Sequence, residues 1–469
     1  MAENCMSFRE VVQKKGFPIR WKEITVNTGG SGSTIQDLKV PESAGGYVFR
    51  DGNRLQSYAR NRFIYWRVHK DTLELVELSL DNDLHGNAIR LHFQDSAILG
   101  DISIFESRGE VVFLVATVSS VHRLVFPHPS SLQHQMSIFT DASVVNLCEP
   151  SDCHSISPVS NVAYSLHAAG AWLTTEGEAL FALATSTGSI LFIKLPPKGI
   201  QGIVTQHELK HASMMQRLWT GLVPAMIRGG PSEADMAESV CLHYLGQDVF
   251  IFAICRDHKL RMWSCKNQEC VLVSDMLDFI PDKLDPLKGT IGARGHVIRK
   301  SVEGNMLHLG VFLNFSDRNQ FCIFQPVLAD GRYQLNLITT VFAPNEDLVE
   351  FSLTNTHLWS LWTTSESETV VRYAALDDDN FSYDPWNMVH LQQPESPEVI
   401  VPLHREPRET YMDYIFYPGR FTAQTISKAL NIYRRSLDSL MGHGLHISSQ
   451  VLREEVTAAV ENEVGGCLA

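Results

Sequence analysis

The sequence predicts a mainly β protein, a WD-like β-propeller followed by a short α-helical segment. Three observations support this prediction. From Ser43 onward, short apolar runs follow one another at roughly the 8–12-residue spacing of antiparallel strands. These runs fall into groups of four, and a turn followed by a strand recurs in the third member of several groups. After about residue 400, apolar residues repeat with a helical period instead.

The clearest group surrounds an alternating strand at Lys259–Trp263, which two apolar runs flank, Phe250–Ile254 and Cys270–Val273. Asp257 precedes this strand as it does in the third strand of a WD-type blade. In such blades the Asp carboxylate accepts hydrogen bonds in the turn, and the Trp fills the contact with the next blade. Ser264 occupies the position of the usual second Asp. The alternative is an ordinary meander in another β protein, and recurrence of the pattern decides between the two.

The pattern does recur, at Asn61–Trp66, Thr187–Ile193 and Asn319–Phe324. Six groups of strands are counted, and a β-sandwich rarely needs so many strands. Apolar runs rather than strict alternation fit sheets that are covered on both faces. The predicted strands, group by group, are 46–49, 54–59, 63–68 and 73–80; 88–93, 101–106, 111–118 and 122–126; 170–173, 179–184, 189–195 and 203–209; 239–244, 250–254, 259–263 and 270–273; 296–302, 306–313, 320–327 and 334–341; and 348–353, 358–362, 369–374 and 388–391.

Each group takes about 60 residues, against roughly 40–45 in a regular WD blade. The surplus lies in two insertions, 128–167 and 210–231, and the second contains a predicted short helix from Ser213 to about Leu222. A Pro-rich segment, 393–407, marks a boundary. We therefore predict a propeller at 17–400 and an α-helical segment at 401–469.

Two helices are predicted in the C-terminal segment. Thr422 is a suitable N-cap for the first, and its apolar face holds Ile426, Ala429, Leu430, Tyr433 and Leu437. Ser448 or Ser449 is a suitable N-cap for the second, in which Leu452 and Val456 share a face. Two such helices cannot bury their apolar faces alone. They must dock on the propeller or continue into a helical stack.

Composition limits the classes of function. The formal net charge of -14 argues against nucleic acid as the main ligand, because phosphate binding needs a basic face. The N-terminus lacks the pattern of a signal peptide, and no apolar run reaches the roughly 18 residues needed to span a bilayer. The nine cysteines are scattered through predicted strands, which indicates reduced core residues in the cytosol or nucleus.

No pattern in the sequence argues for catalysis, a cofactor or a metal. Cys148, Cys153 and His154 lie close together, but four ligands at zinc spacing are absent from the sequence. His258 is interpreted as an exposed turn residue. A propeller enzyme would need acids or histidines at the inner ends of strands, and the predicted first strands supply only His92 and His243.

Longer segments carry a more specific pattern, among them Arg60–Arg67, Val121–Leu124, Glu176–Leu183, Asp257–Ser264 and Gln320–Gln325. These segments resemble the N-terminal propeller region of the 160-kilodalton nucleoporin family, and the similarity spans residues 43–463. The resemblance implies a scaffold subunit of the Y-shaped complex in the outer rings of the nuclear pore. It implies a location at the nuclear envelope, other Y-complex scaffold nucleoporins as partners, and a structural part in pore assembly, mRNA export and protein transport. No catalytic or cofactor residue carries over.

The family has seven blades and a long helical stalk, so we expect a seventh sheet and expect that this chain lacks the stalk. The seventh sheet has three candidate sources, namely 17–40, weak strands at 400–417, or sequence beyond residue 469. The alternative function is a propeller adaptor that recruits partners to a ubiquitin ligase or a vesicle coat.

Overall fold

The computed structural model describes residues 19–29, 42–49, 61–133, 135–147, 149–157, 165–200, 202–211, 235–280, 295–304, 306–315, 319–376, 385–389, 401, 404–417, 419–437 and 451–459. The predicted strand at 54–59, the predicted helix at 213–222 and Cys148 lie outside these residues.

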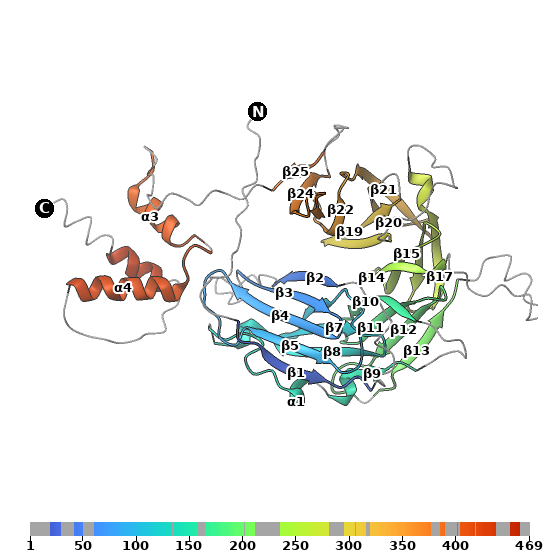
Figure 1. The fold of residues 1–469 in the computed structure, drawn as a ribbon, viewed down its shortest axis with the longest axis horizontal. Helices are drawn as coiled ribbons and strands as arrows, with labels where there is room; N and C mark the ends of the chain where they lie inside the picture. Colours follow the sequence, from blue (N-terminus) through green and yellow to red (C-terminus); the bar gives the residue numbers. More distant parts are fainter. Residues whose placement is uncertain are drawn as a thin grey trace, which may run out of the picture.

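The described strands form six sheets around an axis, and each sheet runs outward from an inner strand (Figure 1). The first sheet holds β1 (Lys22–Val26), β2 (Ser43–Val48), β3 (Arg62–His69), β4 (Thr72–Ser79) and β5 (Ala88–Phe93), and the second holds β6 (Ser103–Ser107), β7 (Glu110–Ala116), β8 (Ser120–Pro127) and β9 (Cys153–Ser155). The third sheet holds β10 (Leu166–Leu173), β11 (Ala179–Thr185), β12 (Ile190–Leu195) and β13 (Thr205–Leu209), and the fourth holds β14 (Ala237–Leu245), β15 (Asp248–Cys255), β16 (Lys259–Ser264) and β17 (Glu269–Asp275). The fifth sheet holds β18 (Val297–Glu303), β19 (Met306–Asn314), β20 (Asn319–Ala329) and β21 (Arg332–Phe342), and the sixth holds β22 (Asp347–Leu353), β23 (His357–Thr363), β24 (Thr369–Ala375) and β25 (Asn387–Met388).

Apolar clusters between successive sheets hold this arrangement together. Five clusters join the first sheet to the second, and so on to the sixth. In β15, for example, Ile251 packs toward the third sheet and Phe252 toward the fifth, and both are fully buried. Each such side chain contributes roughly 1.5–3 kcal/mol relative to an exposed one. Burial on both faces explains why these strands read as apolar runs.

The WD-type features of β16 are confirmed. The Asp257 carboxylate accepts from the backbone N–H of Lys259 at 3.3 Å and from Arg261 at 2.8 Å. Trp263 is buried in the cluster that joins the third and fourth sheets. Ser264, in the place of the second Asp, hydrogen-bonds the carboxylate of Asp248.

The grouping of strands is confirmed for the third to sixth sheets and is wrong for the first two. The segment Ala88–Phe93 is not the inner strand of the second sheet; it is β5, which pairs antiparallel with β4. The second sheet instead takes its outer strand, β9, from the insertion 128–167. An apolar run next to a short loop fits an inner or an outer strand equally well, so sequence spacing alone misassigned it.

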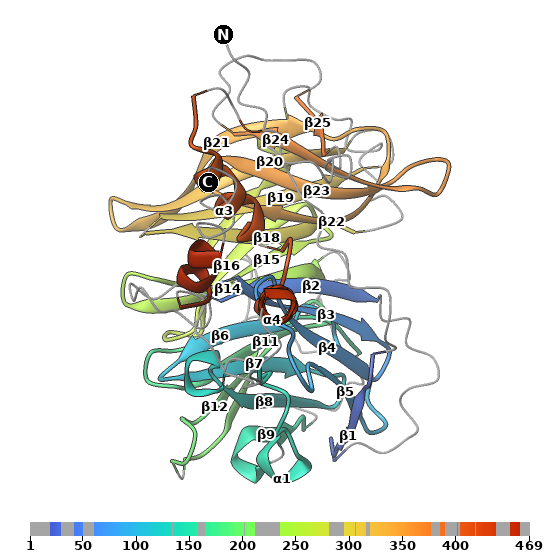
Figure 2. The ribbon, with the colours of Figure 1, turned by 90° about the vertical axis from the view of Figure 1, so that its left-hand side faces the viewer.

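In their described residues, two of the three candidate sources do not form a seventh sheet. Within 17–40 the chain forms β1, which pairs parallel with β5 at the outer edge of the first sheet (Figure 2). Within 400–417 it forms the helix α3, Pro407–Ile415, rather than strands. Among the described residues there is no seventh sheet and no apolar cluster that joins the sixth sheet to the first. The ring formed by the described sheets is therefore open on that side (Figure 1).

Three helices follow the sheets: α3, α4 (Ala423–Leu437) and an unlabelled helix at 451–459. They share a small core of five buried residues, Met412, Ile426, Leu430, Leu452 and Val456. As predicted, Thr422 caps α4, because its Oγ1 accepts from the N–H of Thr425 at 3.4 Å. Ala429 is exposed rather than part of the packed face. No helix in the described ranges is long and apolar enough to cross a membrane.

Candidate functional site

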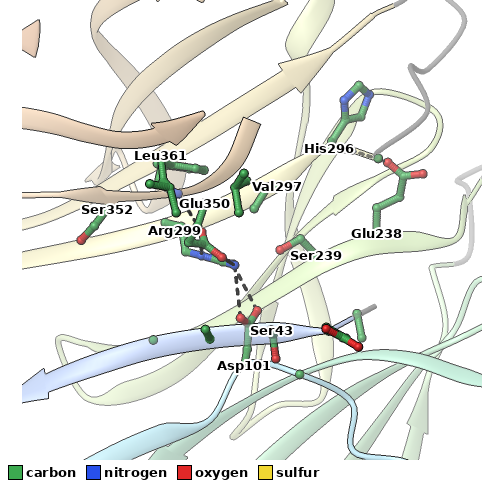
Figure 3. Close-up of a pocket in the computed structure, with 18 of the residues that line it drawn as sticks. Ser43, Asp101, Glu238, Ser239, His296, Val297, Arg299, Glu350, Ser352 and Leu361 are labelled. Carbon is green, nitrogen blue, oxygen red and sulfur yellow. Dashed lines mark hydrogen bonds and ion pairs between the residues drawn. The ribbon is translucent and has the colours of Figure 1, made fainter. Parts of the chain in front are cut away.

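A cavity of about 930 Å³ occupies the axis of the ring and extends toward its open side. Residues on or beside strands of all six sheets line it, and Figure 3 shows several of them around Arg299. The lining includes Asp101, Glu238, His296, Arg299, Glu350, Trp359 and Leu361. These residues lie on or beside strands near the axis, which is where a propeller usually carries a ligand or reactive groups.

Arg299, on β18, lies at the centre of the cavity and joins three sheets. Its guanidinium donates to Asp101, which precedes β6, at 3.1 and 3.2 Å. It also donates to Glu350 on β22 at 3.0 and 2.8 Å, so the guanidinium makes a bidentate contact with each carboxylate (Figure 3). Burial alone would lower the pKa of Arg299, but the two carboxylates outweigh burial and raise that pKa. The cationic form is therefore fixed, and Arg299 is not a general base.

The other described acids of the cavity also have partners. Glu238 on β14 accepts from the backbone N–H of His296 at 2.6 Å and from Arg256 at 3.3 Å. Burial raises the pKa of Glu238, although the contacts with His296 and Arg256 oppose that rise. Glu42 pairs with His69. The contact between Glu238 and His296 joins the fourth sheet to the fifth.

Farther along the same inner strands, aromatic and cationic side chains pack against each other. Trp172 on β10 makes edge contacts with Phe105 on β6 at 5.3 Å and with His243 on β14 at 5.0 Å between ring centroids. The ammonium of Lys300, on β18, lies 4.4 Å from the centroid of the Trp172 ring and also donates to the carbonyl of Leu242. Burial lowers the pKa of Lys300 to about 8. Four successive sheets thus meet through one cluster.

Of the histidines considered in the sequence, His243 lies on an inner strand as predicted, whereas His92 and His258 differ from their predictions. His92 does not face the axis: it lies on β5, outside the inner strand, and contacts Glu23 at 2.6 Å. His243 does lie on an inner strand, and burial lowers its pKa to about 4. His258 is half-buried rather than exposed, because its Nδ1 contacts Nε2 of His296 at 2.9 Å.

The His258–His296 contact also fixes a tautomer. Nδ1 of His296 accepts from the backbone N–H of Asn314 at 3.1 Å, so the proton of this ring is on Nε2 and points to His258. Burial, with His258 as a second cause, lowers the pKa of His296 to about 3. The contact between the two rings joins the fourth and fifth sheets.

Of the Cys and His residues near 150, the structure describes Cys153 and His154. Cys153 and His154 are neighbours on β9 and point to opposite faces, and His154 contacts Gln206 at 3.3 Å. Over the ranges described above, no group of three or more His, Cys, Asp or Glu side chains is arranged to hold a metal ion. The described cysteines are free thiols, of which Cys255, Cys265 and Cys322 are buried.

The helical segment meets the first sheet at the β4–β5 loop. The N–H of Ala423 donates to the carbonyl of Asp81 at 2.7 Å. Thr422 Oγ1 donates to Asp83 at 3.1 Å, and the N–H of Asp83 donates to the side chain of Gln424 at 3.0 Å. The start of α4 is thus joined to the propeller by hydrogen bonds. Sequence reasoning did not predict this contact between α4 and the β4–β5 loop, because residues about 340 positions apart share no local pattern.

These features define a class: a β-propeller with an attached helical unit, in which charged groups beside the axial cavity are paired across sheets. The chain belongs to a particular family within this class, described as "Nucleoporin Nup120/160, beta-propeller domain", whose model matches residues 62–468.

Individual relatives agree with the family. The chain is 41% identical over 464 residues to the human "Nuclear pore complex protein Nup160", covering 96% of this chain and 32% of that protein. It is 34% identical over 474 residues to the "Nuclear pore complex protein Nup160 homolog" of Drosophila melanogaster, covering 98% and 32%. It is 25% identical over 230 residues to "Nucleoporin NUP120" of Chaetomium thermophilum, covering 44% and 18%. The chain spans about a third of the length of its first two relatives.

Proposed function

We propose that this chain is the propeller-bearing part of a nuclear pore scaffold subunit, located at the nuclear envelope. The observation that carries the proposal is the family match over residues 62–468, with human and fly relatives named as nuclear pore complex proteins. The expected role is structural and non-catalytic, in pore assembly and hence in mRNA export and protein transport. The expected partners are other scaffold nucleoporins of the Y-shaped complex.

The geometry supports a structural role. Three charged groups meet at the axis as Arg299 with Asp101 and Glu350, and their distances of 2.8–3.2 Å are those of formed ion pairs. Fixed, paired charges resist the changes in protonation that acid–base catalysis needs. A rigid block that meets its partners through its surface is the role that best fits such an interior. The family match favours this role over an adaptor for a ubiquitin ligase or a vesicle coat.

The limits of the two units remain part of the proposal: a propeller at 17–400 and a helical segment at 401–469. The described strands lie between Lys22 and Met388, and α3 begins at Pro407, which supports that division. We also propose that a seventh sheet, from sequence beyond residue 469, closes the ring. The relatives are about three times as long as the aligned part, so they have room for one.

A fluorescent tag on the full-length protein in cells tests the proposed function. We expect a punctate rim at the nuclear envelope, and recovery of other scaffold nucleoporins when the tagged protein is purified. Diffuse fluorescence, or recovery of ligase or coat subunits without pore proteins, would contradict the proposal. A tag on residues 1–400 alone serves as a comparison, because it tests whether the propeller is sufficient for the location.

A further inference from the structure

The strand β21 is the outer edge of the fifth sheet, in which the order is β18-β19-β20-β21 (Figure 1). It is 11 residues long and pairs with β20 along its whole length. On its other side, the backbone of β21 makes one hydrogen bond with the described part of the chain. Trp386 Nε1 donates to the carbonyl of Phe342 at 2.7 Å. Most of this edge therefore presents backbone N–H and C=O groups to solvent.

The sequence of β21 does not protect this edge with charge. Arg332, its first residue, is its only charged residue, and it contains no proline. The outer strand of the fourth sheet, β17, has an acid at each end, Glu269 and Asp275. Natural edge strands usually carry charges, prolines or bulges that prevent pairing with another chain. The one such device in β21 is a bulge at Ile338, where the pairing shifts from Phe324–Leu337 to Ile323–Thr339.

The bulge leaves a regular, rigid edge over Arg332–Leu337. Tyr333 packs on Phe250 of the fourth sheet with centroids 4.9 Å apart, and this contact fixes the strand from one face. On the other face, Gln334 and Asn336 are exposed and uncharged. Leu337 is 41% exposed at the end of this segment. Six residues span roughly 20 Å, enough to pair with a short extended peptide.

We propose that β21, over Arg332–Leu337, binds an extended and uncharged segment of a partner protein as an added strand of the fifth sheet. Backbone hydrogen bonds supply the binding, as in other cases of strand addition. Cross-strand neighbours share a face, so the bound segment has an apolar residue opposite Leu337 and uncharged residues opposite Gln334 and Asn336. A strongly acidic segment is disfavoured by the net charge of -14 on the chain.

The test uses the 469-residue chain and a labelled, capped peptide of nine alternating Val and Thr residues flanked by Ser-Gly at both ends. We expect saturable binding by fluorescence anisotropy and slower amide hydrogen exchange at residues 332–337. The double variant Gln334→Lys/Asn336→Lys adds two charges at exposed positions of the edge. It is expected to bind the peptide at least about tenfold more weakly while keeping the melting temperature of the unmodified protein.

Two matched controls make the result specific. Thr369→Lys adds a charge at an exposed position of β24 and should bind as the unmodified chain does. A peptide with its central Val replaced by Pro should not bind, because it loses a backbone donor. Equal binding by the double Lys variant, or protection at another strand, would overturn the proposal. So would a dimer of this chain that is lost in the double Lys variant, because it would assign the edge to a second copy.

Discussion

At the scale of single residues, buried ionic groups in this protein have partners on a neighbouring strand, in the insertion 128–167 or beside the next sheet. Arg123 of β8 donates to Asp152 at 2.8 Å and to the carbonyl of Pro196, beyond β12, at 2.7 Å. Arg62 of β3 donates to Glu77 at 2.9 Å and to the carbonyl of Met136 at 2.8 Å. A buried charge that loses its partner is costly, so these contacts fix the positions of sheets and insertions relative to one another.

Arg299→Met should destabilise the protein by about 1–3 kcal/mol, because it leaves Asp101 and Glu350 near each other without a cation. Urea unfolding of the purified chain measures the change. Arg67→Met is the matched control, since Arg67 pairs with Glu74 but its side chain is 64% exposed. The control should cost less than about 1 kcal/mol. Equal losses for the two variants would show that the axial ion pairs add nothing to an ordinary surface pair.

The pH dependence of stability should include a contribution from His243. Burial lowers its pKa to about 4 from 6.5, so the unfolded chain binds a proton between these values and the folded chain does not. The free energy of unfolding therefore falls as pH falls from 6.5 to 4, by up to about 1.4 kcal/mol per pH unit for this group. Above pH 6.5 the contribution is constant.

His243→Phe isolates this contribution, because the ring keeps its edge contact with Trp172 but has no titrating group. Urea unfolding at about pH 7, 6 and 5 should show a flatter dependence for the variant. His122 and His296 contribute in the same direction, and Glu77, Asp152 and Glu238 oppose them, since burial raises their pKa values. The difference between the two proteins removes these shared contributions. Parallel pH curves would contradict the assignment.

At the scale of elements, the helical unit depends on a few hydrogen bonds to the β4–β5 loop. In its described residues the core of this unit holds five buried side chains, and short helices gain most of their stability from packing. Its opening therefore needs less free energy than opening of the sheets, which have an apolar cluster on one or both faces.

Thr422→Ala removes both the cap of α4 and the hydrogen bond to Asp83, at a cost of about 1–2 kcal/mol. We expect faster amide hydrogen exchange across 423–434 and 451–459, with unchanged exchange in β14–β17. Lys428→Ala is the control, since Lys428 lies in α4 beyond the capped turn and is exposed. Equal acceleration in both variants would show that the joint to the loop does not hold the helices.

Sequence reasoning succeeded where an element is specified locally. The strands of the third to sixth sheets and the cap at Thr422 follow from apolar runs, turns and one hydroxyl. It failed where partners are distant in the sequence. The sequence of Ala88–Phe93 does not distinguish an outer strand from an inner one. The sequence of Cys153–Ser155 does not indicate that this segment pairs with β8. Arg299 was missed because its carboxylates lie 198 and 51 residues away.

At the scale of the whole molecule, the open side of the ring leaves an apolar face of the sixth sheet uncovered by another described sheet. The sixth sheet turns Trp359, Leu361 and Val371 toward the cavity, and Val371 is 40% exposed. Trp359 stacks on Tyr373 with centroids 5.1 Å apart, which gives that face a flat aromatic surface. Apolar faces of this kind are covered by a neighbouring sheet at all five other contacts between sheets.

A longer chain that adds the sequence following residue 469 in the full-length protein should therefore close the ring. We expect the amides of β22–β24 and β2–β3 to exchange more slowly than in the 469-residue chain. A seventh sheet would cover the face of the sixth sheet and the face of the first sheet that border the opening. The strands β10–β12 are the internal control, since their faces are already covered. Leu361→Asp should reduce the added protection in the longer chain and leave the shorter one nearly unchanged, because its side chain faces the cavity. If lengthening the chain left exchange in β22–β24 unchanged, the opening would be a surface for another protein.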